Sequence, residues 1–199
     1  MNKFVLLWAL TLSYNMSSAQ TLWSIKAGLN LAKFKATATI PGFGSGSATS
    51  DNLTSFHAGF TLRAPISSEV SIQPEVLYSG QGGSSQGVDL TTDYINVPIM
   101  LQYHASPNFN LQFGPQLGFL ISAEAAGQSV MDDLETFDFA LGFGFEAAVG
   151  GPVSLGFRYN LGLSNFSKMP TGAPAGTTLT TTNQVMQFSV GLRLGQRVE

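Results

Sequence analysis

The chain has 199 residues, of which 11% are charged and 44% hydrophobic, and its mean hydropathy is +0.16. Charged residues make up about a quarter of an ordinary soluble domain, so this chain has too few of them to cover a water-facing surface. Nine Lys and Arg against 12 Asp and Glu provide no basic footprint, which excludes nucleic acid as a partner. Cysteine is absent, which excludes disulfides, thiolate metal sites and Cys nucleophiles, and two His leave little for metal or triad chemistry. We therefore expect no cofactor.

The first 19 residues have the pattern of a removable secretory signal. Lys3 gives a positive start, residues 4–12 are apolar, and the Ser-Ser-Ala sequence ending at Ala19 is a small-x-small cleavage pattern. The apolar stretch is well short of the roughly 20 residues that a membrane-spanning helix needs. We predict cleavage after Ala19, which leaves residues 20–199 as a single domain.

From residue 22 onward, large apolar side chains alternate with small or polar ones, which is the period of a strand with two different faces. In the first segment Trp23, Ile25 and Leu29 share one parity, while Lys26 and Gly28 share the other. The pattern predicts eight strands of about ten residues, the length that a tilted strand needs to cross a bilayer. These strands are expected at 22–31, 55–63, 70–79, 94–103, 109–121, 137–149, 153–163 and 186–194.

The connections between these strands alternate between long and short. Long segments are expected at 35–52, 81–90, 123–136 and 164–183, and short turns at 65–69, 104–108 and 150–152. In outer-membrane barrels the short turns are periplasmic and the long loops extracellular. We therefore predict that both termini are periplasmic.

Alternation alone does not say which face is inside, because a soluble lipocalin-type barrel also alternates and keeps its apolar face around a ligand. Here the apolar parity carries nearly all the Phe, Trp, Leu and Ile of the strands, and an eight-strand interior has no room for them. The other parity is rich in glycine, which suits a narrow lumen. The sequence thus predicts an all-β fold: a closed, antiparallel, eight-stranded transmembrane up-and-down β-barrel with a polar lumen. Aromatic residues expected in the interfacial girdles are Trp23, Tyr103 and Phe109 on the turn side, and Phe56, Tyr78 and Phe137 on the loop side.

Several segments carry a resemblance to a known family. They are IKAGLNLAKF (25–34), IQPEVLYSGQG (72–82), YINVPIMLQY (94–103), LQFGPQLGFL (111–120), FDFALGFGFE (137–146) and FRYNLGLSNF (157–166). In these the chain resembles the PorT-like outer-membrane β-barrel family over essentially its whole mature length. The resemblance implies a small eight-stranded, porin-like barrel, usually without an assigned activity.

Charged and polar residues on the lumen parity are the first candidate site: Lys26, His57, Glu75, Asp138, Glu146 and Arg158. Counting from the turn end puts Lys26, Glu75, Glu146 and Arg158 at one level, where opposite charges are expected to meet. The tight turn at 150–152 should bring Glu146 and Arg158 together as a direct or diagonal pair. Such a cluster is either a selectivity or proton-relay site or a packed polar core. The second interpretation is favoured, because eight strands leave no room for an open channel.

Two further sets of charges fall at the strand ends. Arg63 and Arg193 are expected at the periplasmic mouth, as solvated charges. The third long loop gathers the acids Glu124, Asp132, Asp133 and Glu135 without a basic residue among them. They are either a site for a divalent cation or a cationic partner, or a solvated acidic tip. The tip is favoured, because their order matches no EF-hand loop.

We expect a non-enzymatic, monomeric barrel in contact with outer-membrane lipid. Its long loops are available to an extracellular partner, in adhesion, envelope organisation or secretion support. The alternative is a ligand-binding barrel, either a soluble periplasmic lipocalin analogue or a membrane barrel that passes a small apolar molecule. A barrel-embedded lipid hydrolase needs a Ser, a His and an acid near the outer leaflet. It is disfavoured because His57 points inward and His104 lies at the turn end.

Overall fold

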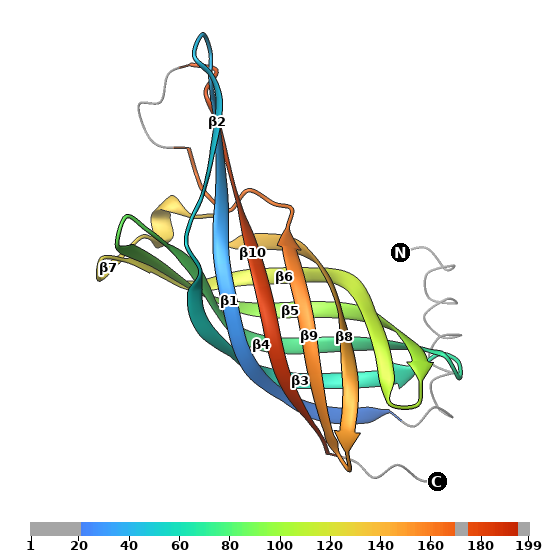
Figure 1. Cartoon of the computed structure of the whole chain (residues 1–199). Coiled ribbons are helices and arrows are strands. Elements are labelled where there is room, and N and C mark those ends of the chain that lie inside the picture. The colour runs from blue at the N-terminus through green and yellow to red at the C-terminus, as the bar shows by residue number, and fades with distance from the viewer. Residues whose placement is uncertain (1–20, 170–174, 195–199) are drawn as a thin grey trace, which may run out of the picture.

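Every segment with period-two alternation forms a strand that pairs antiparallel with its neighbours along the chain (Figure 1). The computed structural model describes residues 21–169 and 175–194, so the expected signal peptide lies outside the described residues. The ring consists of β1 (Leu22–Ile40), β3 (Leu53–Pro65), β4 (Val70–Ser85), β5 (Val88–Ser106), β6 (Phe109–Ala125), β8 (Phe137–Gly150), β9 (Val153–Gly162) and β10 (Thr178–Arg193). The predicted eight-stranded all-β barrel is confirmed.

The ring is closed by the first and last strands. β1 and β10 pair in continuous register from Ser24 with Arg193 to Thr39 with Thr178. Closure leaves no unpaired edge within the ring, which is what a sheet in hydrocarbon requires. We call the end where β1 begins and β10 ends the turn end, and the opposite end the loop end.

The strands are longer at the loop end than their hydrophobic pattern predicts. The expected loop at 81–90 is a continuation of β4 and β5 that turns at Gln86 and Gly87, both with positive φ, as in a two-residue hairpin turn. Ala126 and Gly127 make the same kind of turn between β6 and β7 (Gln128–Ser129). A 3₁₀ helix η1 (Met131–Asp133) follows β7.

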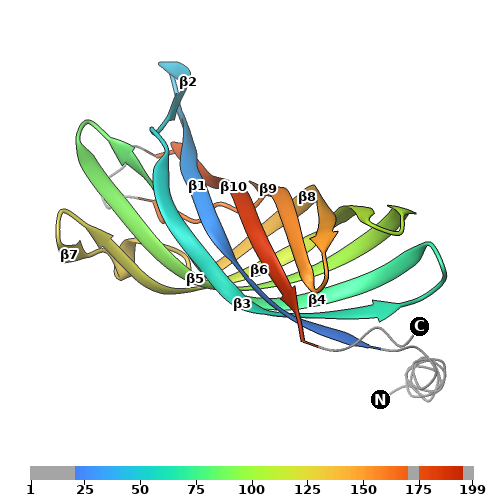
Figure 2. The ribbon, with the colours of Figure 1, turned by 60° about the horizontal axis from the view of Figure 1, so that its bottom comes forward.

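The expected first loop also contains a strand. β1 runs on to Ile40 and pairs with β2 (Gly44–Thr49), and this hairpin extends beyond the ring together with the start of β10 (Figures 1 and 2). The prediction of long connecting loops at 35–52 and 164–183 was therefore wrong for the residues that form β2 and these extensions. Among the described residues, no helix has the length and hydropathy needed to span a membrane.

The two strand faces have the predicted orientation. Outward-facing Trp23 and Phe143 are 54% and 48% exposed, whereas inward-facing Glu75 and Gln187 are 1% and 2% exposed. Large apolar side chains therefore cover the outer surface, and most of the buried side chains are polar. This contradicts the alternative of a lipocalin-like barrel, which would hold its ligand in an apolar interior.

Inward-facing glycines permit close strand approach. A Cβ at Gly28, Gly59, Gly114 or Gly144 would lie 1.9–2.0 Å from a carbonyl oxygen of the neighbouring strand. Glycine at these positions lets the sheet curve tightly enough to close with eight strands. Outside, ring pairs such as Phe56 with Tyr78, with centroids 5.2 Å apart, pack across neighbouring strands on the lipid-facing surface.

Candidate functional site

The centre of the lumen is organised around one carboxylate, Glu75 of β4. Arg158 of β9 donates to both of its oxygens, from Nη1 to Oε2 at 2.8 Å and from Nη2 to Oε1 at 2.7 Å. Lys26 of β1 donates from Nζ to Oε1 at 2.7 Å, and Gln73 donates to the same oxygen at 2.7 Å. All three charged side chains are at most 7% exposed. Glu75 is therefore the shared partner of two cations that have almost no access to solvent.

The predicted closeness of Glu146 and Arg158 on neighbouring strands is confirmed, but the expected ion pair between them is not among those in the described part of the chain. The ladder places Glu146 opposite Gly156 and Gly144 opposite Arg158, so the two residues are diagonal neighbours. The Arg158 side chain instead crosses the lumen to Glu75, and its Nη2 also donates to Gln112 Oε1 at 2.8 Å. The expected meeting of opposite charges at one level is confirmed for Lys26, Glu75 and Arg158.

Glu146 pairs with a residue that we expected to be solvated. Arg63 Nη2 donates to Glu146 Oε1 at 2.6 Å, and the two side chains are 18% and 11% exposed. Gln112 Nε2 lies 3.4 Å from Glu146 Oε2 and so connects this pair to the central carboxylate through Arg158. The charged residues of the lumen thus form one network that reaches the turn end.

A cavity of about 700 Å³ opens at the turn end of the lumen. It is lined by Arg63 and Glu146, by His104 and by Arg193, whose backbone N–H donates to Pro152 O at 2.9 Å. The predicted position of Arg63 and Arg193 at the mouth on the turn side is therefore confirmed. The ion-paired network forms the inner wall of this cavity.

His57 belongs to a neutral layer on the loop side of the charged one. Its Nδ1 lies 2.8 Å from Asn30 Oδ1 and its Nε2 lies 2.9 Å from Ser189 Oγ. Because an amide oxygen only accepts, Nδ1 donates, and in the neutral ring Nε2 accepts from the Ser189 hydroxyl. Asn30 in turn donates to Ser79 Oγ at 3.0 Å and to Gly80 O at 2.7 Å.

The Ser189–His57–Asn30 arrangement places a hydroxyl, an imidazole and an orienting amide in sequence, as a nucleophilic hydrolase requires. Its surroundings differ from those of an active site. His57 is 1% exposed and Asn30 is fully buried, and Gln187 also donates to Asn30 Oδ1, at 3.1 Å. The three residues lie inside the lumen, away from the lipid-facing surface where a lipid substrate would be.

Asp138 lies nearer the loop end and has neutral partners. It accepts from Ser164 Oγ at 2.5 Å and from Asn183 Nδ2 at 3.1 Å. Asn183 Nδ2 also lies 3.4 Å from the Tyr94 hydroxyl oxygen. The predicted position of Asp138 on the lumen side is confirmed, but Asp138 lies apart from the ion pairs.

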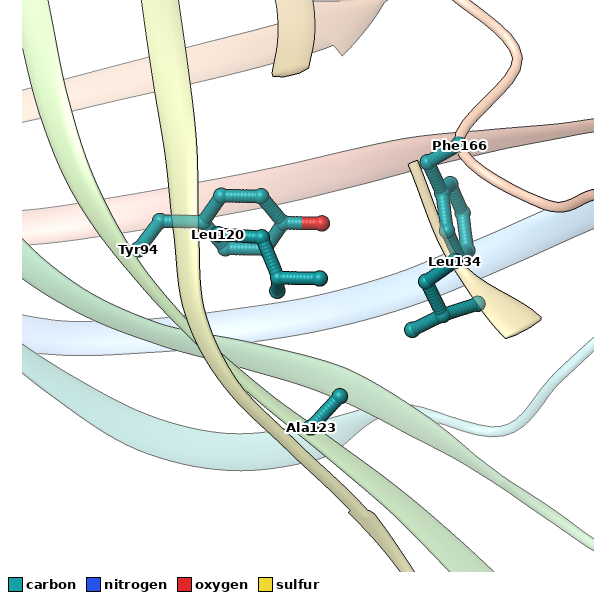
Figure 3. Packing of buried hydrophobic residues seen from close by; sticks show 5 residues of the cluster. All are labelled: Tyr94, Leu120, Ala123, Leu134 and Phe166. Atoms are coloured by element: carbon teal, nitrogen blue, oxygen red, sulfur yellow. The ribbon is translucent and has the colours of Figure 1, made fainter. Parts of the chain in front are cut away.

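An apolar cluster closes the lumen beyond Asp138 (Figure 3). It consists of Tyr94, Leu120, Ala123, Leu134 and Phe166, all at most 6% exposed. In Figure 3 Leu134 and Phe166 lie side by side, and the Tyr94 ring points towards them. Hydrogen bonds from Glu135 N to Phe166 O and from Phe166 N to Thr181 O hold the two loop residues over the barrel.

The acidic loop does not form a cluster of converging oxygens. Glu124 lies on β6, Asp132 and Asp133 lie in η1, and Glu135 follows it, and all four side chains are exposed. Lys168, which was not predicted to lie near these acids, donates from Nζ to Asp132 O at 2.9 Å. Within residues 21–169 and 175–194, no group of three or more His, Asp or Glu side chains is arranged to hold a metal ion.

The Asn and Gln side chains of the lumen were not predicted from the sequence as site residues. Gln73 and Gln112 are hydrogen-bonded to members of the charged layer. Gln187 belongs to the neutral layer, where it donates to Asn30 Oδ1 at 3.1 Å and accepts from Asn160 Nδ2 at 2.8 Å. Each lies on the lumen parity, so the strand pattern carried the signal, but amides carry no charge that would single them out.

The comparison with protein families agrees with this fold. The family model described as "Outer membrane protein beta-barrel domain" matches residues 15–168. The chain belongs to this family. Its place in the outer membrane follows from that membership and from the lipid-compatible outer surface. No protein with a curated functional description matches the sequence.

Solved structures of several small barrels are similar to this chain. The outer membrane protein OprG from Pseudomonas aeruginosa is 10% identical with a TM-score of 0.49, covering 89% of this chain and 98% of that one. Neisserial surface protein A is 14% identical with a TM-score of 0.48, covering 85% and 96%. Ail, the attachment invasion locus protein of Yersinia pestis, is 13% identical with a TM-score of 0.44, covering 85% and 98%.

Proposed function

We propose that the chain is a non-enzymatic outer-membrane barrel whose closed lumen serves stability and whose loop end serves as a contact surface. The observation that carries this proposal is the filling of the lumen. The network of Lys26, Glu75 and Arg158 lies across it, and the cluster around Tyr94 and Phe166 closes it on the loop side. A barrel that is filled at two levels is poorly suited to conducting ions or passing an apolar molecule.

In the proposed orientation, the turn end and both termini are periplasmic and the loop end is extracellular. The short turns at one end and the long hairpins at the other support this orientation, because outer-membrane barrels share that asymmetry. Within the family, we assign the chain to the PorT-like group on the sequence segments given above. The roles that fit are envelope organisation, adhesion or secretion support, with an extracellular partner at the loop end and the barrel itself a monomer.

A lipid hydrolase is the enzyme activity to test, because His57 is hydrogen-bonded to Ser189 on one side and to Asn30 on the other. What supports a non-enzymatic role is their position between the charged layer and the apolar cluster. A lipid acyl chain would have to displace one of these two layers to reach Ser189.

Epitope tags inserted beside Gly44 in the β1–β2 hairpin and beside Ser67 in a short turn test the orientation. Antibody should reach the tag at Gly44 on intact cells, and reach the tag at Ser67 only after permeabilisation. Labelling of Ser67 without permeabilisation would overturn the orientation.

The contact role is tested by shortening the β1–β2 hairpin. Lys35 and Thr49 are direct partners in the ladder, so an Asn-Gly turn can replace residues 36–48. This removes the β1 partners of residues 178–181 but keeps the β1–β10 pairing from Ser24 with Arg193 to Lys35 with Thr182. The shortened barrel should fold normally but lose the attachment, envelope or secretion phenotype of the intact protein. The matched control replaces Gln86-Gly87 by Asn-Gly, which changes a hairpin turn and leaves β1–β2 intact. If shortened and intact barrels restore all three phenotypes of a deletion strain equally, the proposed role is wrong.

A further inference from the structure

Beyond the ring, three strands form a small sheet with one hydroxyl-rich face. β2 pairs with β1, and β1 pairs with β10, so residues that are direct partners point to the same side of this sheet. The outward side consists of three rows, which are Thr49, Lys35 and Thr182; Ser47, Thr37 and Thr180; and Ser45, Thr39 and Thr178. We call these nine residues the hydroxyl face; each is exposed or half-buried.

The hydroxyl face is continuous with the lipid-facing surface of the barrel. Along β1 the same parity carries Leu29 and Leu31, then Lys33, then Lys35. Along β10 it carries Phe188, then Gln184, which is the ladder partner of Lys33. Apolar residues thus give way to polar ones at one level on two neighbouring strands. This change marks the edge of the bilayer's hydrocarbon core on the loop-end side. The hydroxyl face therefore lies directly beside the polar headgroup layer of the surrounding leaflet.

The charge on this surface is positive. Lys33 and Lys35 face outward, and none of the three ion pairs in the described part of the chain involves either of them. No member of the hydroxyl face is acidic. Asp51, the nearest acid along the chain, pairs through its backbone with Ser84 of β4.

We propose that the hydroxyl face and Lys33 bind the phosphorylated sugar headgroup of an anionic glycolipid in the outer leaflet. The lysines supply charge for phosphate groups, and Ser and Thr hydroxyls both donate to and accept from sugar hydroxyls. This assignment rests on the proposed orientation, in which the loop end is extracellular.

The height of the sheet favours a glycolipid over a phospholipid. The six residues of β1 from 35 to 40 span about 20 Å, at about 3.3 Å per residue. At a strand tilt of about 40°, that is about 15 Å above the hydrocarbon. An ordinary headgroup layer is only about 5–8 Å thick. Only a lipid with a large polar headgroup can cover the whole face.

The composition of the face also disfavours a protein partner. The cores of protein interfaces are enriched in aromatic residues, Met and Arg and depleted in Lys and Ser. The hydroxyl face contains none of the enriched types. Headgroups of the neighbouring leaflet are present at high local concentration, so weak individual hydrogen bonds suffice to occupy it.

The test uses the full mature chain in dodecylmaltoside micelles. The chain contains no cysteine, so Ser47→Cys on the hydroxyl face and Gly46→Cys on the opposite face each accept one polarity-sensitive dye. Lipopolysaccharide, phosphatidylglycerol and phosphatidylcholine are titrated separately. Lipopolysaccharide should change the fluorescence at position 47 and leave position 46 unaffected, and phosphatidylcholine should affect neither.

Substitutions separate the charge from the hydroxyls. K33Q/K35Q should raise the apparent Kd for lipopolysaccharide about thirty-fold, since each lysine near an anionic surface contributes about 1 kcal/mol. T37V/T180V should raise the Kd for lipopolysaccharide several-fold and leave that for phosphatidylglycerol unchanged. Ala38→Ser, on the opposite face, should change neither.

Two results would overturn the proposal. One is an equal lipopolysaccharide response from positions 46 and 47. The other is equal affinity for phosphatidylglycerol and lipopolysaccharide, with T37V/T180V binding both as the wild type does. The titration in micelles does not depend on cellular orientation, so its failure is distinguishable from a failure of the tag experiment.

Discussion

Replacing Glu75 by Gln should be among the most destabilising single changes in the lumen. The substitution keeps the size of the side chain but removes the negative charge with which both Lys26 and Arg158 are paired. Lys26 and Arg158 are 7% and 5% exposed at their side chains, so neither can turn to solvent for compensation.

The magnitude follows from the burial of the partners. Removing one member of a buried ion pair costs about 3–5 kcal/mol, because the remaining charge stays desolvated. E75Q leaves two such charges, although Arg158 keeps its bond to Gln112, so we expect a loss of about 4–5 kcal/mol in the free energy of unfolding. Glu146→Gln is the matched control: its partner Arg63 is 18% exposed and can be hydrated, so the loss should be about 1 kcal/mol.

Urea unfolding of the protein refolded into phosphatidylcholine vesicles, followed by the mobility of the folded band on gels, measures these losses. The triple variant K26M/E75Q/R158M should recover much of the stability lost in E75Q, since removing a whole buried charge cluster is far cheaper than breaking it. Equal unfolding midpoints for E75Q and E146Q would refute the reasoning, as would a triple variant less stable than E75Q.

Three further outcomes are expected. Phe143→Arg should cost about 2–4 kcal/mol by placing a charge on the lipid face, and Phe143→Cys should cross-link to a lipid-dissolved photoprobe while resisting aqueous maleimide. Maleimide labelling without the cross-link would reverse the face assignment. Gly114→Ala should cost about 3 kcal/mol, because its Cβ would lie 2.0 Å from Ile99 O. Gly156→Ala should be nearly neutral in the same urea assay, because the atom nearest to its Cβ would be 3.5 Å away. Similar unfolding midpoints for the two variants would contradict the argument from close strand approach. Ser189 should not react with a fluorophosphonate reagent in vesicles. If the wild-type protein is labelled and Ser189→Ala is not, the lipid hydrolase becomes the better interpretation.

Much of the fold followed from the period of the sequence. The alternation of Trp23 and Ile25 with Lys26 fixed strand identity and, with the size argument, the lumen side, because a one-residue shift would have put every large side chain inside. The level count also placed Lys26, Glu75 and Arg158 together. These are properties of single strands and short turns, which the sequence encodes locally.

The exact ion pairs were not predictable in the same way. Glu146 and Arg158 are close along the chain, but Arg158 reaches Glu75 on β4 because side chains in a narrow barrel meet across the lumen as well as along the ladder. The partner depends on twist and diameter. The spacing of the residues along the chain determines neither the twist nor the diameter.

The sequence of the strand extensions at the loop end contains a strand signal, but their loop-like composition obscured it. Most of residues 35–40 and 178–182 are small or polar and so suggested a loop, yet both segments are rich in Thr, which favours strands. The turns at Gln86-Gly87 and Ala126-Gly127 lack the usual Asn or Asp before Gly. Pairing across β1 and β10, and not local preference, holds these extensions together.

The closed lumen is tested most directly by conductance in planar lipid bilayers. Wild-type protein should insert without discrete current steps, because the Glu75 network and the cluster around Phe166 each obstruct the lumen. The variant with the shortened β1–β2 hairpin should also remain silent, since that hairpin lies outside both barriers. Stable, reproducible steps from the wild-type protein would contradict the account, because they would require a continuous aqueous path past both layers.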